Sequence, residues 1–545
     1  MARLLDGLVR LDHGPSPVDG VTETAYAKEP ITMTCLISAP RMAFVLSLIA
    51  TPVLADVTAD QVWQNWQDLG GRMGYHFEPA EVVRDGATMT LRDLAFSATD
   101  GTTEITGTIP QVVLVEQGDG TVSVDIADDY EMMVISKDMA EQPSTARIIV
   151  TLTGDELTAS GTPEAMNYAF LAESAAFAVR DLTDGESPMD VVLDGRVEAI
   201  DFRYDLVPGD NINLDVTVAM QSFTFGGSGT PNDDEMKSFE FDSKLTGLTG
   251  MTKYVLPGSV MTENTDPLVF FQEGGSVDTT LNYEGGEISA TFITPDDVET
   301  SMTGSTMGGR FNIAFSLGKL NYLVEAQALS TSVTGLRVPE MGGIPLPELK
   351  VSYDEAGIDL RIPLAPGEEA QDFTMNTWQK GLTLSDTIWR MFDPLSKLPR
   401  EPMTVVLDVT GKLRPIMNMF DPETFEGKEA PIEIDQVDLN ALQVTAAGAE
   451  LLGDGNVTFD NSQPKVLGDF LPMPIGVLNL SLTGADALMG TLLEMGLIDQ
   501  EAVAGFGMMS AIFARPGDEP DTLVSTIEWK ADGMYANDML IPMGP

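Results

Sequence analysis

The sequence predicts a β-rich α+β fold, a long twisted antiparallel meander sheet capped by a few amphipathic helices. Three observations predict this fold. Apolar and polar residues alternate with a period of two in many short segments, Gly- and Asp-rich stretches separate these segments, and helical periodicity is confined to a few places. Because short turns join neighbouring strands in antiparallel order, the sheet is expected to follow the order of the chain.

The first segment with a clear signal is an export sequence. Residues 33–55 combine a basic flank at Arg41, an apolar stretch and the small-residue ending Val53-Leu54-Ala55, as cleaved signal peptides do. Pro52 interrupts the apolar stretch before it reaches the ~20 residues that span a bilayer. We therefore expect cleavage before Asp56, a periplasmic mature protein and no stable membrane span after cleavage.

Residues 1–32 are unusual, because an export signal normally begins at the N-terminus. We interpret residues 1–32 as an extension that results from a start codon assigned too early. The natural start is then Met33, and N-terminal sequencing of the native protein tests this interpretation.

The mature chain is strongly acidic. The full sequence has 30 basic and 84 acidic residues, and residues 1–55 contain 4 and 5 of these, so 26 basic and 79 acidic residues remain in the 490 mature residues. A net charge of 26 − 79 = −53 repels nucleic acids and anionic lipid headgroups. The 43% content of hydrophobic residues still predicts a folded chain.

Cysteine and histidine are nearly absent from the mature chain. The single cysteine, Cys35, lies in the leader, and His76 is the only mature histidine. This composition excludes a disulfide scaffold and a Cys/His zinc cage, and no G-x-S-x-G nucleophile motif accompanies His76. The acidic clusters 125–129, 232–235 and 454–456 lack EF-hand spacing and are interpreted as solvated turns. We predict no catalytic residue, no cofactor and no metal site.

The strands have one apolar and one polar face. In residues 213–220, for example, Leu214, Val216 and Val218 alternate with Asn213, Asp215 and Thr217. Residues 287–292 show the same alternation. The candidate contacts of a ligand groove are Leu214, Val216, Val218, Ile288 and Phe292, with packing into a filled core as the alternative for each.

Glycine-containing segments predict the connections between strands. Hairpin turns are expected at 117–120, 194–195, 284–286, 454–456 and 532–533, and a linker is expected at 226–231. The composition favours a domain boundary near residue 370. It would separate a first helix plus antiparallel β region, 56–370, from a second one, 371–545.

Three regions have helical periodicity. Thr58-Ala59-Asp60-Gln61 resembles a capping box and precedes an apolar stripe that ends at Leu69. Residues 386–395 repeat this spacing at an offset of 326 residues, which indicates either a duplication of helix and sheet or two independent covering helices. Residues 485–493 and 502–513 predict a C-terminal helical hairpin with a break at Gly496.

Several strings carry a resemblance to a known family. Asp60-Gln-Val-Trp-Gln-Asn-Trp-Gln-Asp-Leu69, Gly453-Asp-Gly-Asn-Val-Thr-Phe459 and Leu478-Asn-Leu-Ser-Leu-Thr-Gly-Ala485 resemble an uncharacterised family of exported alphaproteobacterial proteins known only as a domain of unknown function. The resemblance covers residues 56–545 and implies a periplasmic β-rich fold without assigned functional residues. The one-faced strands with helical caps also resemble AsmA/YdgA-type envelope proteins, whose curved sheets form apolar grooves.

Two functions from different classes follow. The first is a non-enzymatic periplasmic envelope protein that binds lipid or another apolar ligand on the concave face of its sheet. The second is a carboxylate-based carbohydrate-active enzyme, which requires a polar cleft lined by aromatic residues and two carboxyl groups. A structural or adaptor protein that binds another envelope protein through a sheet edge is a third alternative.

Overall fold

The computed structural model describes residues 57–99, 102–137, 143–185, 187–207, 209–231, 236–258, 267–337, 343–417, 419, 431–464 and 471–541. All of these residues belong to one compact unit, which spans Leu46–Pro545. The predicted extension 1–32 and signal peptide 33–55 lie outside the described residues, as does the acidic cluster 232–235.

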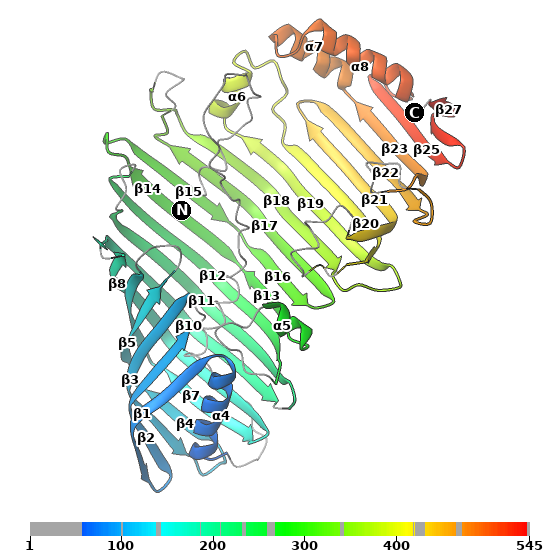
Figure 1. Cartoon of the computed structure of the whole chain (residues 1–545). Coiled ribbons are helices and arrows are strands. Elements are labelled where there is room, and N and C mark those ends of the chain that lie inside the picture. The colour runs from blue at the N-terminus through cyan, green and yellow to red at the C-terminus, as the bar shows by residue number, and fades with distance from the viewer. Residues whose placement is uncertain are drawn as a thin grey trace, which may run out of the picture. The chain divides into compact units, whose positions relative to one another are not determined.

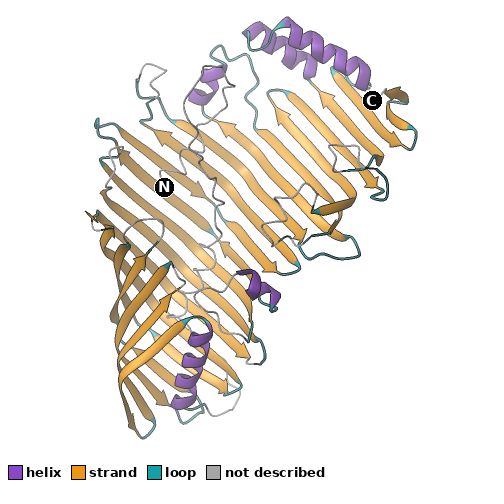
Figure 2. Ribbon diagram, in the orientation of Figure 1, coloured by secondary structure: helices purple, strands orange, loops and turns teal. Residues whose placement is uncertain are grey.

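One sheet contains every strand of the described residues (Figure 2). The strands are β1 (Tyr75–Asp85), β2 (Thr88–Thr99), β3 (Thr103–Glu116), β4 (Val122–Ile126), β5 (Asp129–Ser136), β6 (Ser144–Thr153), β7 (Glu156–Thr162), β8 (Ala165–Asp184), β9 (Ser187–Pro188), β10 (Asp190–Val207), β11 (Ile212–Thr230), β12 (Ser238–Leu256), β13 (Ser276–Tyr283), β14 (Gly285–Ile293), β15 (Glu299–Thr306), β16 (Gly309–Ser316), β17 (Lys319–Thr334), β18 (Leu349–Pro363), β19 (Gln371–Leu384), β20 (Met403–Pro415), β21 (Ile432–Ala446), β22 (Ala449–Phe459), β23 (Pro474–Thr483), β24 (Arg515–Pro516), β25 (Thr522–Lys530), β26 (Gly533–Ala536) and β27 (Met539–Ile541).

Five helices accompany the sheet in the described part of the chain. They are α4 (Ala59–Arg72), α5 (Pro267–Gln272), α6 (Asp386–Phe392), α7 (Ala485–Met495) and α8 (Gln500–Phe513). The predominance of antiparallel strands with a few short helices confirms the predicted β-rich α+β class. The predicted capping box of α4 is present, because the Thr58 hydroxyl accepts from the Gln61 N–H and the Gln61 side chain accepts from the Thr58 N–H. The predicted C-terminal helical hairpin is also present.

Neighbouring strands of the sheet mostly follow one another in the chain (Figure 1). In two places, each of two long strands pairs with two shorter strands, one along each half of its length. The long strand β3 pairs with β5 along its first half and with β4 along its second half, and β6 and β7 pair in the same way with β8. The segment from β12 to β17 has the same connectivity, with β13 and β14 on β12 and with β15 and β16 on β17. A six-strand unit is thus repeated in topology.

The hydrophobic core lies at the N-terminal end of the sheet, around α4. This helix contacts β1, β2 and β3, and its Asn65 Oδ1 accepts a 2.7 Å hydrogen bond from the Tyr168 hydroxyl on β8. Val62 and Leu69 on α4 are fully buried. Strands from both sides therefore touch the same helix, so the sheet curls around α4 in this region (Figure 1).

Local kinks shift the alternation of buried and exposed side chains within long strands. In β10 the buried residues Gly195 and Ile200 differ by five positions, whereas residues on one face of a regular strand differ by an even number. Ala199, which lies between them, has a φ of 51°. Gly247 in β12 and Ala328 in β17 have φ values of 59° and 48° at equivalent places in the ladder. The pairing register is the same on both sides of these kinks, so each strand keeps one apolar face along its whole length.

Several predicted turns are strand interiors instead. Asp194-Gly195 lies within β10, and residues 454–456 lie within β22. A Cβ atom at Gly195 would lie 2.0 Å from Cζ of Phe177, and one at Gly455 would lie 2.4 Å from the Val477 carbonyl oxygen. The predicted linker at 226–231 belongs mostly to β11, where a Cβ at Gly227 would lie 2.4 Å from Leu193 Cδ2. These glycines permit close packing between neighbouring strands and do not form turns.

The connection near residue 370 joins two neighbouring strands. β18 and β19 pair directly, with Leu360 opposite Met375. The sheet therefore continues from the predicted first region, 56–370, into the predicted second region, 371–545. The turns at 117–120 and 532–533 connect β3 to β4 and β25 to β26, as the sequence predicts.

Candidate apolar ligand-binding face

The pairing register identifies which side chains share a face, because opposed residues in an antiparallel ladder project to the same side. One row of opposed residues runs without interruption from β8 to β27 and contains no charged side chain. We name the face that carries this row the apolar face. Its members are Tyr168, Tyr204, Val216, Thr252, Thr279, Ile313, Tyr322, Leu360, Met375, Val409, Leu439, Gly455, Leu478, Ile527, Ala536 and Met539.

A second row lies beside the first on the same face and is also uncharged. It consists of Phe170, Phe202, Val218, Gly250, Leu281, Phe311, Val324, Ile358, Thr377, Leu407, Leu442, Gly453, Leu480 and Ser525. Side chains two positions apart on a regular strand point in the same direction. On β21 the two members, Leu439 and Leu442, are three positions apart because the pairing register shifts between them. The apolar character is therefore a property of a continuous surface and not of isolated positions.

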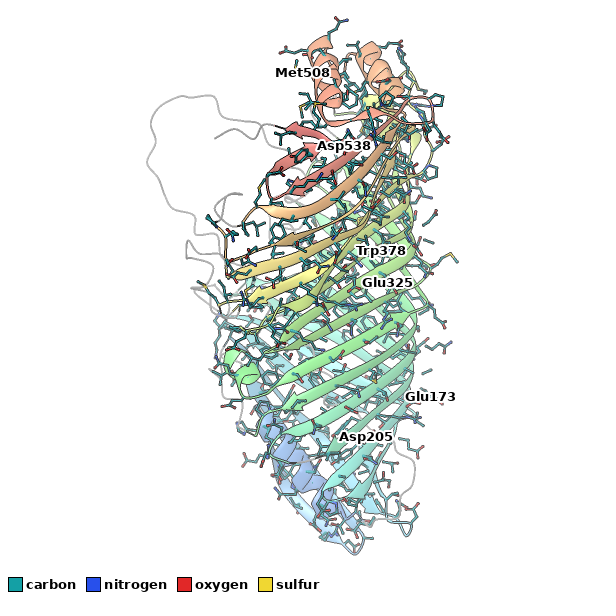
Figure 3. The ribbon with its side chains drawn as sticks, turned by 90° about the vertical axis from the view of Figure 1, so that its right-hand side faces the viewer. Glu173, Asp205, Glu325, Trp378, Met508 and Asp538 are labelled. Carbon is teal, nitrogen blue, oxygen red and sulfur yellow. The ribbon has the colours of Figure 1, made fainter. Side chains whose placement is uncertain are left out.

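The opposite face, named the outer face, carries the charges. Asp205, Asp215, Lys253 and Asp278 are directly opposed on neighbouring strands of this face. Ion pairs such as Lys253–Asp215 at 3.7 Å lie here, and Figure 3 labels Asp205 and Glu325 along this side of the sheet. Burial, and then the nearby Asp215 carboxylate, raise the pKa of Asp205.

Cover over the apolar face changes along the sheet. At the α4 end, Tyr168 and Phe170 are fully buried and Leu214 is 6% exposed. Farther along the chain most side chains of the same face are half-buried, and Met375 and Met539 are 45% and 57% exposed. Val409, Ser525 and Ala536 are buried on this part of the face. The face is thus covered at the α4 end and only partly covered farther along the chain.

The serine and threonine hydroxyl groups on the two rows have partners within the protein. Thr252 and Thr279 share a 3.1 Å hydrogen bond, and the Thr377 hydroxyl donates to the Gly357 carbonyl at 3.3 Å. The Ser525 hydroxyl donates to the carbonyl oxygen of Phe513 at 2.5 Å. These groups are therefore occupied, so the face offers a ligand mainly apolar contact.

All five predicted contact residues lie on the apolar face. Leu214 is buried near α4, whereas Val216, Val218 and Phe292 are half-buried and Ile288 is 40% exposed. Ile288 stands opposite Ser243, and Phe292 stands opposite Phe239, on the apolar side of β12.

Two further exposed residues of this face are not among the five predicted contacts. Met375 on β19 and Val405 on β20 are exposed by 45% and 38%, and both belong to segments that alternate clearly. The alternation marks them as members of an apolar face. It does not show that α4 covers only the N-terminal strands, because that depends on how the sheet curls.

The outer face is hollowed at the N-terminal strands. A hollow of about 900 Å³ is lined by residues of β1, β2, β3, β5 and β6, including His76, Glu78, Glu131 and Arg147. The Arg147 guanidinium pairs with Asp181 at 2.7 Å and with Glu131 at 3.1 Å, and these contacts raise the pKa of Arg147.

Aromatic residues do not form a sugar-stacking platform in this hollow. Its two aromatic lining residues, Phe96 and Tyr130, are only 5% and 3% exposed. Carbohydrate sites usually present exposed aromatic rings beside their carboxylates, so this geometry gives the carbohydrate-active alternative no support.

Acidic clusters in the described residues do not converge on a cation position. No group of three or more His, Cys, Asp or Glu side chains within these residues has metal-binding geometry. Burial, followed by the Asp128 and Asp125 carboxylates, raises the pKa of Asp155 near the predicted cluster 125–129. Asp454 accepts a 3.1 Å hydrogen bond from Asn479 on the neighbouring strand.

Comparison with known proteins adds no identity to these findings. No protein-family model, curated protein or solved structure matches this chain. Among the helices of the described residues, none combines the length and the apolar character needed to cross a membrane.

Proposed function

We propose that this protein is a non-enzymatic periplasmic envelope protein that binds the acyl chains of lipids on its apolar face. The observation that carries the proposal is the pair of uncharged rows, most members of which are half-buried or exposed over the strands that α4 does not cover. Soluble proteins rarely expose continuous apolar surface on this scale unless it binds something.

The size of the exposed surface suits acyl chains. Counted from β11 to β25 with both included, the ladder is twelve strands wide. This width corresponds to about 50 Å at the usual spacing of ~4.8 Å between neighbouring strands. One leaflet of a bilayer contributes about 15 Å of hydrocarbon, half of a ~30 Å core. The face is thus long enough to accommodate more than one acyl chain, each methylene contributing about 0.8 kcal/mol on burial.

The chemistry of the face favours acyl chains over polar ligands. The hydroxyls of Thr252, Thr279 and Thr377 bond within the protein, and charged side chains are confined to the outer face along these rows. A sugar bound here would lose hydrogen bonds to water without replacement, which is unfavourable. A hydrocarbon chain loses none.

A fluorescent fatty acid tests this proposal with matched variants. We expect the full chain to bind cis-parinaric acid and the double variant Met375→Glu/Leu480→Glu to bind at least about tenfold more weakly, because each new carboxylate must be desolvated against the ligand. The control Thr374→Glu/Ser481→Glu adds the same charge at adjacent positions on the outer face and should bind like the wild type.

Two results would overturn the proposal. One is a wild-type protein that does not bind the probe. The other is equal loss of binding in the apolar-face and outer-face variants, since this would indicate a general charge effect. Circular dichroism of each variant verifies that the sheet is intact.

A further inference from the structure

The hairpin formed by α7 and α8, residues 485–513, has apolar side chains that the fold does not use. Met508, Met509 and Ile512 on α8 are 68%, 56% and 41% exposed, and no residue of α8 is buried. At 100° per residue, these three side chains occupy a sector about 100° wide. The opposite sector contains Val503, Phe506, Ser510 and Phe513, which are half-buried. The exposed sector thus faces away from the protein.

The hairpin is anchored at its two ends, and near its bend by the 3.0 Å ion pair of Glu494 with Lys397, and not through this sector. The Asp521 carboxylate accepts from the backbone N–H groups of Asp486 and Ala487 at 2.9 and 3.1 Å, at the start of α7. The carbonyl of Phe513, at the end of α8, accepts from Ser525 and from Asn537. The middle of α8 therefore needs no apolar exterior to stay in place.

Charge is absent from most of α8. Residues 502–513 contain no Asp, Glu, Lys or Arg, whereas the acids of the hairpin, Asp486, Glu494, Asp499 and Glu501, lie at or near helix ends. The hairpin has no basic side chain at all. An anionic surface would therefore be repelled, and an uncharged apolar surface would not.

Polar groups that could specify a protein partner are also missing from the exposed sector. The only side-chain hydroxyl in residues 502–513 is that of Ser510, and it donates to the Gly507 carbonyl at 3.1 Å. Specific protein interfaces combine an apolar centre with a polar rim and direct hydrogen bonds. A lipid interface requires neither.

We propose that the α7–α8 hairpin docks the protein onto a zwitterionic lipid bilayer, with Met508, Met509 and Ile512 inserted at the boundary between headgroups and acyl chains. α8 has 14 residues and a length of about 21 Å, so it lies along the interface and does not span it. The hairpin adjoins one end of the apolar face, because Ser525 on that face bonds to Phe513 (Figure 3). The proposal does not require that the apolar face binds lipid.

Vesicle flotation tests the proposal. We expect the full chain to float with phosphatidylcholine vesicles at both low and high salt, and to float less with vesicles rich in phosphatidylglycerol. The vesicle-bound fraction of the variant Met508→Glu/Ile512→Glu should be at least about tenfold lower than that of the wild type, because charged side chains insert poorly into the interface.

A matched control adds two acids away from the hairpin. Thr374→Glu/Ser481→Glu places them on the outer face of the sheet and should float like the wild type. Absence of wild-type flotation, or flotation that both variants retain, would overturn the proposal. The wild type could also form a dimer in vesicle-free solution that the variant Met508→Glu/Ile512→Glu dissociates. This result would assign the exposed sector to contact with a second copy and would overturn the proposal.

The same variants separate this proposal from the function proposed for the apolar face. Met508→Glu/Ile512→Glu should retain binding of cis-parinaric acid, and Met375→Glu/Leu480→Glu should retain flotation. Loss of one property without the other shows which surface fails.

Discussion

Individual carboxylates experience different environments in this acidic protein. Burial is the main cause that raises the pKa of Asp155, between β6 and β7, and the Asp128 and Asp125 carboxylates raise it further. Asp119, in the turn after β3, is exposed, and the Thr121 hydroxyl and N–H lower its pKa by bonding to the carboxylate. The fold thus disfavours the charged form of Asp155 and favours that of Asp119.

The sign of the pH dependence at Asp155 follows from this difference. A raised pKa in the folded state means that the folded protein binds more protons, so this group's contribution to stability falls as the pH rises from the unfolded-state pKa through the folded-state pKa. Asp155→Asn removes the unfavourable charge. We expect a Tm at pH 7 that is higher by on the order of 1 °C, with no gain near pH 3, where the aspartate is already neutral.

Asp119→Asn is the control for this measurement. Its charge is favoured in the folded state, so its replacement should not raise Tm at pH 7. Thermal unfolding followed by circular dichroism at both pH values measures the two effects. An equal rise in Tm for both variants would indicate a general relief of net charge and would contradict the assignment to burial at Asp155.

Glycine shows where prediction from sequence fails at the residue scale. Asp532-Gly533 and Asp454-Gly455 look alike in the sequence, but the first forms a turn and the second lies within β22. The difference lies in a neighbouring strand, since the Val477 carbonyl leaves no room for a Cβ at position 455. Such a contact depends on the pairing register and cannot be read from local composition.

At the scale of single elements, the strands and helices were largely predictable. Alternation within a strand needs only the local sequence, and the caps of α4 and the glycine break between α7 and α8 act within one turn of helix. The pairing of β4 and β5 with two halves of β3 was not predictable, because it depends on the relative lengths of strands distant in sequence.

The two ends of the apolar face should respond differently to the same truncation. Leu206 on β10 is 2% exposed beside α4, whereas Leu478 on β23 is half-buried on the same face. Leu206→Ala should lower the free energy of unfolding by about 2–5 kcal/mol, because it leaves a cavity. Leu478→Ala should lower it by about 1 kcal/mol or less, because solvent reaches the site.

Urea unfolding of the two variants measures this difference. Equal losses of several kcal/mol would show that Leu478 belongs to a filled core. The apolar face near β23 would then be unavailable to ligands in the folded protein, and the proposed function would lose its structural basis there.

For the molecule as a whole, the distribution of charge matters more than its total. Along the ladder of the described residues, charged side chains such as Asp205, Asp215 and Lys253 lie on the outer face, and the two uncharged rows of the apolar face carry none. The sequence predicted this separation from alternation alone. It did not predict which strands α4 would cover, because that is set by the curl of the sheet around the helix.

The most direct test of the proposed function is the composition of the protein isolated from its native host without detergent. We predict that native mass spectrometry shows added masses on the chain, that organic extraction removes them, and that the extract contains acyl lipids. Protein that carries no acyl lipid and takes up no added fatty acid would contradict the claim that the apolar face is a lipid-binding surface.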